Sequence, residues 1–402
     1  GGAVSDWGQR GPGQPFFGFI NFPVTHESGV FPPLGNRPQS AMHFVMQVMR
    51  WYSQDEPLPK RVNPQDIVVP PYYPDTKTVR TDMARHYDNI ANMDAEVGTI
   101  LKQLEAAGLA DSTIVIWTTD HGDGLPRGKR ELFDSGIKVP MIIRWPEAFR
   151  PEGVKPGAVD KRLISFVDLG PTILSLAGVS VPGTMQGHDF VAPDASPNEY
   201  IYASRDRIDE LMDRQRAVRD SRYKYIRSWY PEVSGGTDLT FRDNIDMVRE
   251  MRSMYDAGRL NTVQQQWYQA PGKERLFDLE SDPFEIHDVS GEPHYQRALQ
   301  RMRGEMDAWL ARAGDWSEES ESAMVARFEP SGKRRVTPAP TLSLEEGTLV
   351  ITPAAAGHSL EYRVDGGRWQ LYTEPASVNN TNGIEARAVR YGWEESESVS
   401  GF

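Results

Sequence analysis

The most reactive combination of side chains lies in one short stretch, TTDHGDGLPRGKR. Asp120 and His121 are adjacent there and are followed by Gly122. A carboxylate beside an imidazole can bind one divalent cation, or two, and a glycine lets the backbone approach a ligand closely. Lys129 follows in the same loop, where its ammonium could neutralise a sulfate or a phosphate. The stretch therefore has the residue types of an anion site next to a metal.

His26 is the second candidate, because it follows the apolar run PFFGFINF between Pro15 and Phe22. The run is bounded by prolines and predicts a buried strand. A histidine beyond the end of such a strand could donate to an oxyanion or protonate a leaving group. Ligands gather at the carboxyl ends of strands in open α/β sheets, which is where His26 and Asp120 are expected.

Each of these residues also has a purely structural interpretation. An aspartate after a strand is often a turn former or a helix cap, and Asp123 and Asp134 are interpreted in that way. His26 could be a satisfied structural histidine, and Lys129 could be one solvated cation among its neighbours. Their joint placement at the strand ends of one sheet favours the functional interpretation.

Hydrophobic spacing predicts the elements that position these residues. Apolar residues recur at three- and four-residue steps from Val79 to Leu104 and predict an amphipathic helix closed by Gly108. The runs STIVIWTTD and VPMIIRWP predict two more buried strands. Strand, helix and strand in this order predict an α/β fold with a central mixed sheet flanked by helices.

The chain divides into four predicted parts by composition. Residues 1–194 are assigned to the catalytic α/β domain and 195–328 to a small α+β subdomain with amphipathic strands and a terminal helix. Residues 329–340 are rich in proline and charge and predict a linker. Residues 341–402 alternate around a DGG turn and predict a β-sandwich.

Composition excludes several classes of protein. The 402 residues carry a formal net charge of −13, which argues against a general nucleic-acid binder because such a protein needs a basic face. No apolar run approaches the roughly 20 residues needed to span a membrane. There is no cysteine, so disulfides and thiolate chemistry are excluded. The composition does not set an oligomeric state.

The stretch from Asp75 to Pro146 resembles the type I sulfatases of the alkaline phosphatase superfamily. The resemblance is carried by an amphipathic helix, a strand ending in TTDHGDG, a lysine-bearing loop and VPMIIRWP. PFFGFINFPVTHES, VDLGPTILSLAGV and RAVRDSRYKYIRSW resemble further segments of that family, so the likeness covers about residues 14–315. It is closest to bacterial sulfatases related to heparan N-sulfatases. The tail SLEYRVDGGRWQLY is similar to Ig-like domains appended to glycan-active enzymes.

The resemblance implies a role for each candidate residue. Asp120 and His121 would be ligands of Ca²⁺, which suits oxygen donors and would withdraw charge from a sulfate. His26 would contact the scissile sulfate ester and protonate the leaving oxygen, and Lys129 would bind a sulfate oxygen. The implied substrate is a sulfated carbohydrate, and the implied location is the periplasm or the exterior of the cell.

One departure from the family pattern concerns the nucleophile. The family uses a formylglycine matured from a C/S-x-P-x-R motif, and no such motif occurs in the sequence. The paired aspartates that complete the family's calcium site also have no equivalent before Pro15. We therefore expect the chain to be the C-terminal part of a sulfatase, with its nucleophile in a segment preceding Gly1, and to be inactive alone.

Two other functions stay open. A phosphodiesterase or phosphonate monoester hydrolase of the same superfamily also uses an Asp-His-Gly triplet, but usually with two metals and more histidines than the eight in this chain. A non-catalytic carbohydrate-binding protein is favoured by the predicted β-sandwich. A phosphate-ester assay separates the first from a sulfatase, and glycan binding without turnover separates the second.

Overall fold

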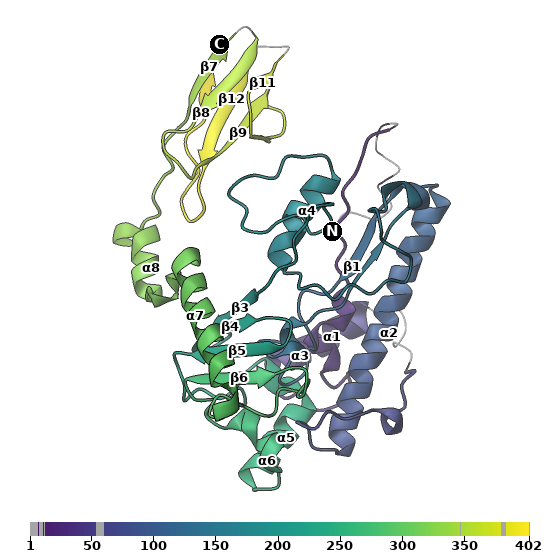
Figure 1. Cartoon of the computed structure of the whole chain (residues 1–402). Helices are drawn as coiled ribbons and strands as arrows, with labels where there is room; N and C mark the ends of the chain where they lie inside the picture. The colour runs from purple at the N-terminus through teal and green to yellow at the C-terminus, as the bar shows by residue number, and fades with distance from the viewer. Residues whose placement is uncertain are drawn as a thin grey trace. The chain divides into compact units, whose positions relative to one another are not determined.

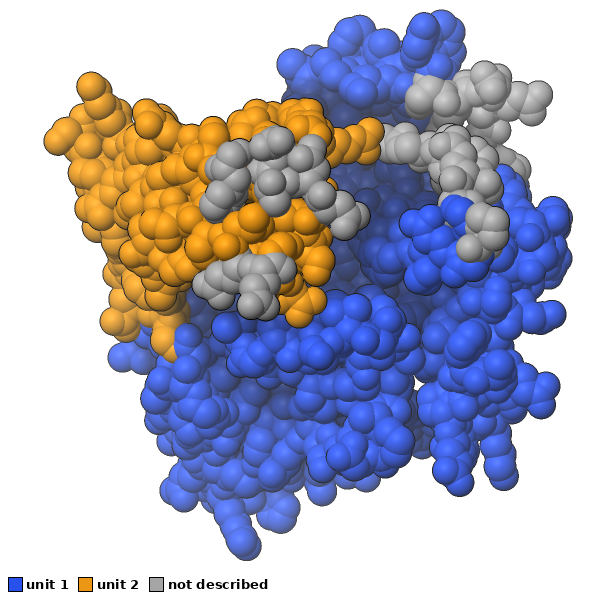
Figure 2. All heavy atoms as spheres, turned by 90° about the horizontal axis from the view of Figure 1, so that it is seen from above, with its two compact units in different colours: residues 1–313 blue, residues 314–402 orange. Residues whose placement is uncertain are grey.

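A computed structural model describes Trp7, Gly11 and residues 13–53, 60–345, 347–378 and 383–401. The chain forms two compact units, residues 1–313 and residues 314–402 (Figures 1 and 2). The predicted α/β class is confirmed, and the ladders between the named strands of the described residues are antiparallel. No described helix is both long and apolar enough to cross a bilayer.

The longest helix confirms the amphipathic pattern predicted for it. Helix α2 (Lys77–Ala106) begins where the hydroxyl of Thr76 accepts the N–H of Val79, and it ends before Gly108, which has a φ of 67°. Its buried apolar side chains include Val79, Met83, Ala84, Met93 and Leu104. Helix α1 (Ala41–Ser53) precedes α2 in the chain.

Two short strands lead into and out of the candidate site. Strand β1 (Val115–Thr118) pairs antiparallel with β2 (Met141–Arg144), and β1 ends two residues before Asp120. Both strands are predicted as buried runs, but β1 is only partly buried throughout. Ile142 in β2 is 64% exposed, because this sheet has only two strands among the described residues.

The prediction of a strand between Pro15 and Phe22 is wrong. These residues are irregular, and Phe17 and Phe19 are 70% and 78% exposed. Apolar composition predicted burial, but a strand also needs a neighbour whose N–H and C=O groups complete the ladder. No strand of the described residues pairs with this segment. His26 therefore does not follow a strand.

A four-stranded antiparallel sheet forms the centre of the first unit. Its order is β3 (Ile201–Ile208), β4 (Leu211–Arg219), β5 (Tyr223–Ser228) and β6 (Glu274–Asp278). Helix α7 (Gln296–Ala313) lies along one face (Figure 1). The apolar residues between them are Val218, Tyr225, Leu276, Val289, Leu299, Met302 and Met306.

The opposite face of this sheet carries the loop that follows Asp120. Alternate residues of a strand point to opposite faces, so Ala217 faces away from its neighbour Val218. Ala217, Ile226 and Phe277 pack against Leu132 and Phe133 of the loop. The sheet is therefore the platform on which the lysine-bearing loop rests.

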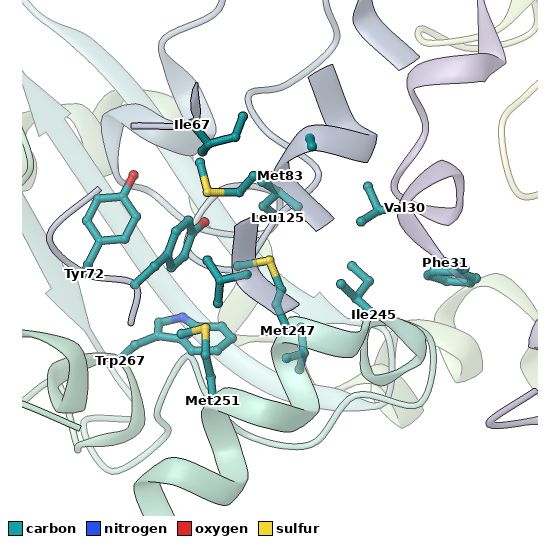
Figure 3. Packing of buried hydrophobic residues seen from close by; sticks show 14 residues of the cluster. Val30, Phe31, Ile67, Tyr72, Met83, Leu125, Ile245, Met247, Met251 and Trp267 are labelled. Carbon is teal, nitrogen blue, oxygen red and sulfur yellow. The ribbon is translucent and has the colours of Figure 1, made fainter. Parts of the chain in front are cut away.

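A second apolar cluster joins the His26 segment to the same loop (Figure 3). It contains Val30 and Phe31, which follow His26, together with Leu125 from the loop. Helix α2 and helix α5 (Asp246–Asp256) contribute the other sides of the cluster. The remaining helices of the first unit are α3 (Asp134–Ile137), α4 (Leu169–Leu176) and α6 (Thr262–Gln265).

The second unit begins with helix α8 (Glu321–Phe328) and continues as two small sheets. One sheet has the order β10-β9-β12-β13 and the other β11-β8-β7, and Leu349, Ile351, Leu360, Ile384, Ala386 and Ala388 form their core. The strands are β7 (Thr341–Glu345), β8 (Thr348–Thr352), β9 (Ser359–Val364), β10 (Gln370–Tyr372), β11 (Ala376–Ser377), β12 (Ile384–Val389) and β13 (Val399–Gly401).

Buried charges fix the loop to the sheet. Lys224 of β5 is fully buried, and its ammonium lies 2.6 Å from Asp134 and 2.8 Å from Glu285. Arg219 of β4 makes a further ion pair with Asp134 at 3.1 Å. Burial alone would raise the pKa of Asp134, but Lys224 and Arg219 outweigh it and hold the pKa below the ordinary 3.8. Asp134, predicted as a turn or cap residue, is thus a partly buried anchor of the loop.

Replacing Lys224 with methionine is expected to lower the free energy of unfolding of the first unit by about 3–5 kcal/mol, because Asp134 and Glu285 lose their shared buried partner. Denaturant unfolding at pH 7 measures the loss. Lys155→Met, which removes an exposed lysine, is the control and should change the free energy of unfolding little.

The loss of unfolding free energy in Lys224→Met should also depend on pH. A carboxyl whose folded-state pKa lies below its unfolded value contributes stability that is complete above the unfolded value and disappears as pH falls through the folded value. The wild type and Lys224→Met should therefore converge as pH falls below the ordinary 3.8 of Asp134. A constant difference across pH 3 to 7 would contradict the assignment.

Candidate active site

His26 lies between two single helical turns, Pro23–Thr25 and Glu27–Val30. This tight path depends on Gly29, because a Cβ there would lie 2.5 Å from the side-chain Nδ2 of Asn89 in α2 and 2.7 Å from the backbone carbonyl oxygen of Val24. The segment is therefore seated directly on α2, and its imidazole is left exposed at the surface of the unit.

The structure brings His26 and Lys129 together. The Nζ of Lys129 lies 3.3 Å from Nε2 of His26, although the residues are 103 positions apart. An ammonium has no lone pair, so Lys129 donates and Nε2 accepts. Nδ1 lies 2.9 Å from the hydroxyl of Ser28 and 3.4 Å from its backbone N–H. The shorter contact fits a ring proton on Nδ1, which a lysine donating to Nε2 requires. The geometry thus selects a neutral imidazole whose Nε2 faces the lysine.

Electrostatics favour the same neutral state. The pKa of His26 is lowered from 6.5, first by desolvation and next by the charge of Lys129, while Glu27 acts in the opposite direction. His121 and Asp120 also act on this pKa, so the two candidate groups share one electrostatic neighbourhood. A bound anion would counter the charge of Lys129 and favour the protonated ring.

Glu27 and Arg130 form a buried pair beneath this contact, and sequence reasoning missed it. Glu27 is 1% exposed, and its two carboxylate oxygens accept from Arg130 at 2.7 and 2.8 Å. The ammonium of Lys129 lies 3.4 Å from the same carboxylate. Arg130 also binds Asp209, between β3 and β4, at 2.7 Å. A glutamate next to His26 and an arginine next to Lys129 gave no periodic signal, since their pairing is set by the fold.

Asp120 and His121 occupy the end of β1 side by side. Nδ1 of His121 lies 2.8 Å from the carbonyl of Gly122, which can only accept, so the ring proton is on Nδ1. The lone pair of Nε2 is then free, and it lies 3.8 Å from a carboxylate oxygen of Asp120. The Asp120 side chain is 89% exposed, and His121 is its only partner within ion-pair distance in the described part of the chain.

These two side chains match a metal site in chemistry but do not complete one. A histidine ligand usually donates its other ring N–H to a carbonyl or carboxylate, which is the arrangement of His121. Calcium, however, takes six to eight oxygen ligands. Within residues 13–53, 60–345, 347–378 and 383–401, no three His, Asp or Glu side chains are grouped so that they could hold a metal. Asp120 and His121 therefore supply only part of a coordination shell.

The loop from Asp120 to Ile137 is closed by glycines. The N–H of Gly122 donates to the carbonyl of Gly136 at 2.8 Å, and the N–H of Asp123 donates to Ser135 at 3.1 Å. A Cβ on Gly122 would lie 1.9 Å from the carbonyl oxygen of Ser135. The sequence predicts that Gly122 lets the backbone approach a ligand. In the structure Gly122 instead lets the two ends of the loop approach each other.

Comparison with known proteins decides the family. The Sulfatase family matches residues 4–179, and the family described as N-sulphoglucosamine sulphohydrolase, C-terminal, matches residues 127–270. An ulvan-active sulfatase of Formosa agariphila is 35% identical over 98% of this chain and 69% of its own length. The chain belongs to the sulfatase family. The predicted membership among heparan N-sulfatase-like sulfatases, a group of sulfuric ester hydrolases, is confirmed.

Other sulfatases are similar over smaller shares of their length. A second ulvan-active sulfatase of Formosa agariphila is 29% identical over 65% of this chain and 51% of its own. Human N-sulphoglucosamine sulphohydrolase is 24% identical over 68% of this chain and 56% of its own. This sulfatase chain thus spans about two thirds of one curated relative and about half of the other two.

Among solved structures, a protein in complex with its substrate D-glucosamine-2-N,6-O-disulfate is similar with a TM-score of 0.45. It is 19% identical, and the match covers 61% of this chain and 45% of that chain. A sulfatase from Bacteroides thetaiotaomicron gives a TM-score of 0.45 at 22% identity and covers 61% of this chain and 46% of its own.

Gly122→Ala is expected to lower the free energy of unfolding of this sulfatase chain by about 2–3 kcal/mol, because the new Cβ would overlap a carbonyl that cannot move independently. Hydrogen exchange should rise across residues 122–136. Gly98→Ala is the matched control, since Gly98 lies within α2 with open space around it. This variant should raise the free energy of unfolding by up to about 1 kcal/mol. Equal stability of the two variants would contradict the steric account.

Proposed function

We propose that this chain takes part in hydrolysing a sulfate group from a sulfated carbohydrate. The observation that carries the proposal is the contact between Lys129 and Nε2 of His26, within the electrostatic reach of Asp120 and His121. It unites an ammonium that can bind a sulfate oxygen with an imidazole that can transfer a proton.

The roles follow from the protonation states. Without a substrate, Lys129 donates to a neutral imidazole. A sulfate oxygen placed between the two side chains accepts from the ammonium in place of Nε2 and favours a proton on the ring. His26 can then donate that proton from Nε2 to the oxygen or nitrogen that leaves with the sugar. Lys129 meanwhile neutralises charge on the sulfate.

Asp120 and His121 are proposed as two ligands of Ca²⁺, which would draw electron density from the sulfate oxygens when bound. The exposed carboxylate of Asp120 supports this assignment, and His121 is included because the resemblance implies it. Other ligands must complete the shell, because two side chains do not suffice. The formylglycine nucleophile is assigned, as the resemblance implies, to a segment preceding Gly1, since the 402 residues contain no C/S-x-P-x-R motif.

The substrate class is proposed from the named activities of relatives. Two are ulvan-active sulfatases, and another is an N-sulphoglucosamine sulphohydrolase. Sulfated polysaccharides and N-sulfoglucosamine oligosaccharides are therefore the first substrates to assay. Such polymers lie outside the cell, and we propose that the protein is exported to the periplasm or the medium.

Lys129→Met and His26→Gln should each reduce the rate of sulfate release by a factor of roughly 10² to 10⁴, because one removes charge neutralisation and the other the proton donor. The measurement is sulfate release by ion chromatography, in a protein that joins this chain to a segment carrying the nucleophile motif. Lys138→Met removes an exposed lysine immediately after the same loop and should leave the rate unchanged.

The phosphodiesterase or phosphonate monoester hydrolase alternative is decided in the same assay. Release of phosphate or phosphonate in preference to sulfate, from otherwise matched substrates, would replace the sulfatase assignment. No release of sulfate from any sulfated glycan, by a folded protein that carries formylglycine, would falsify it. Tight glycan binding without turnover in that protein would favour the non-catalytic alternative.

Removal of calcium should abolish sulfate release, and readdition should restore it. Asp120→Asn and His121→Ala should each weaken calcium binding, measured by calorimetry on the same protein, by at least about tenfold, because a ligand lost from the metal shell costs more than a supporting contact. Asp111→Asn, which changes an exposed carboxylate before β1, is the control. Unaltered calcium affinity in both ligand variants would remove them from the site.

A further inference from the structure

Lys129 and Arg130 are adjacent cations with different surroundings. Arg130 is held between two carboxylates, with two contacts to Glu27 and one to Asp209. Among the described residues, Lys129 has one carboxylate neighbour, the 3.4 Å contact to Glu27, and its ammonium points at His26. The charge of Arg130 is therefore largely neutralised within the protein, while that of Lys129 is still available to an anion.

Glu27 is placed so that one carboxylate reaches both cations. It begins the helical turn directly after His26, and a Cβ on Gly124 would lie 3.1 Å from its Cα and its Cβ. The absence of a side chain at Gly124 thus lets the backbone at Glu27 rest against the lysine-bearing loop. Burial alone would raise the pKa of Glu27, but Arg130 and Lys129 outweigh it and hold the pKa below 4.5. The buried carboxylate is therefore ionised at neutral pH.

We propose that Glu27 is a positioning residue, which withholds Arg130 from the substrate and directs the ammonium of Lys129 toward Nε2 of His26. The geometry supports this because a lysine side chain has several rotatable bonds, and a fixed carboxylate on one side with the imidazole on the other leaves it few arrangements. The catalytic meaning of that direction rests on the proposed function. The positioning itself does not, and it can be tested in the chain as it stands.

Glu27→Gln is the test variant and Asp209→Asn the matched control. Both replace a carboxylate that binds Arg130 with an amide of the same shape, but only Glu27 contacts Lys129. Asp209 has a φ of 50°, a conformation that asparagine also adopts readily. Both variants should therefore loosen Arg130, and a difference between them reports on Lys129 alone.

The first readout is the rate at which Lys129 is methylated by formaldehyde and a borane reductant, followed by peptide mass spectrometry. In Glu27→Gln the rate of methylation should rise roughly tenfold over wild type. Loss of a hydrogen bond to a charged group changes an equilibrium by about this factor. Asp209→Asn should methylate Lys129 at the wild-type rate, and Lys155 provides the internal reference. Equal rates in all three proteins, or an equal rise in both variants, would overturn the proposal.

Glu27→Asp covers the case in which Glu27→Gln does not fold. The shorter carboxylate keeps the charge for Arg130 but cannot keep the longer contact to Lys129, so Lys129 should again methylate faster in a folded protein. Wild-type labelling of Lys129 in folded Glu27→Asp would count against positioning.

The second readout uses the protein that carries the nucleophile segment. Glu27→Gln should lower kcat by roughly 10²-fold, as expected for a displaced catalytic group. KM should stay the same or fall, because Lys129 gains freedom to bind the anion without its carboxylate neighbour. Asp209→Asn should keep kcat, and a parallel loss in both variants would assign Glu27 a structural role only. Absence of sulfatase activity in wild type would reject the proposed function and leave the labelling result intact.

Discussion

The arrangement of the site depends on carboxylates buried beneath one loop. Residues 120–137 contain almost no regular structure, and a loop of that kind has no ladder of its own to hold it. Lys224 binds Asp134 and Glu285 near the end of the loop, and Glu27 binds Arg130 four residues earlier. Removing Lys224 or Glu27 takes a buried charge away from its partners, so the ion pairs favour the arrangement of the loop in which these charges meet.

Local patterns predicted the regular elements well. Helix α2 lies where apolar spacing places it, because that spacing reports the face turned to the core. Residues 195–328 contain the four-stranded sheet and helix α7, in keeping with the amphipathic strands and terminal helix expected there. The segment from Pro15 to Phe22 was mispredicted for a related reason. Its composition is that of a buried strand, but whether it forms one depends on a neighbouring strand that the segment itself cannot specify.

The sequence predicts the reactive residues of the site but not the residues that contact and hold them. The residue types and positions predict a site that contains His26, Lys129, Asp120 and His121, and the structure places His26 against Lys129. The partners that hold them were missed. Glu27 and Arg130 are 103 positions apart, and Asp134 and Glu285 are 151 apart, so no local spacing relates them. Their pairing follows from the way the loop packs against α2 and the sheet.

Ionic anchoring has a consequence that apolar packing would not provide. Apolar side chains of the same volume could hold the loop at similar stability, since taking charges out of water offsets much of their attraction. They would not distinguish Lys129 from Arg130. Glu27 accepts two directed hydrogen bonds from the planar guanidinium, so the lysine is limited to a longer contact at the edge of the carboxylate. The same geometry that secures the loop therefore leaves one cation, with the imidazole of His26 in front of it, free to meet an anion.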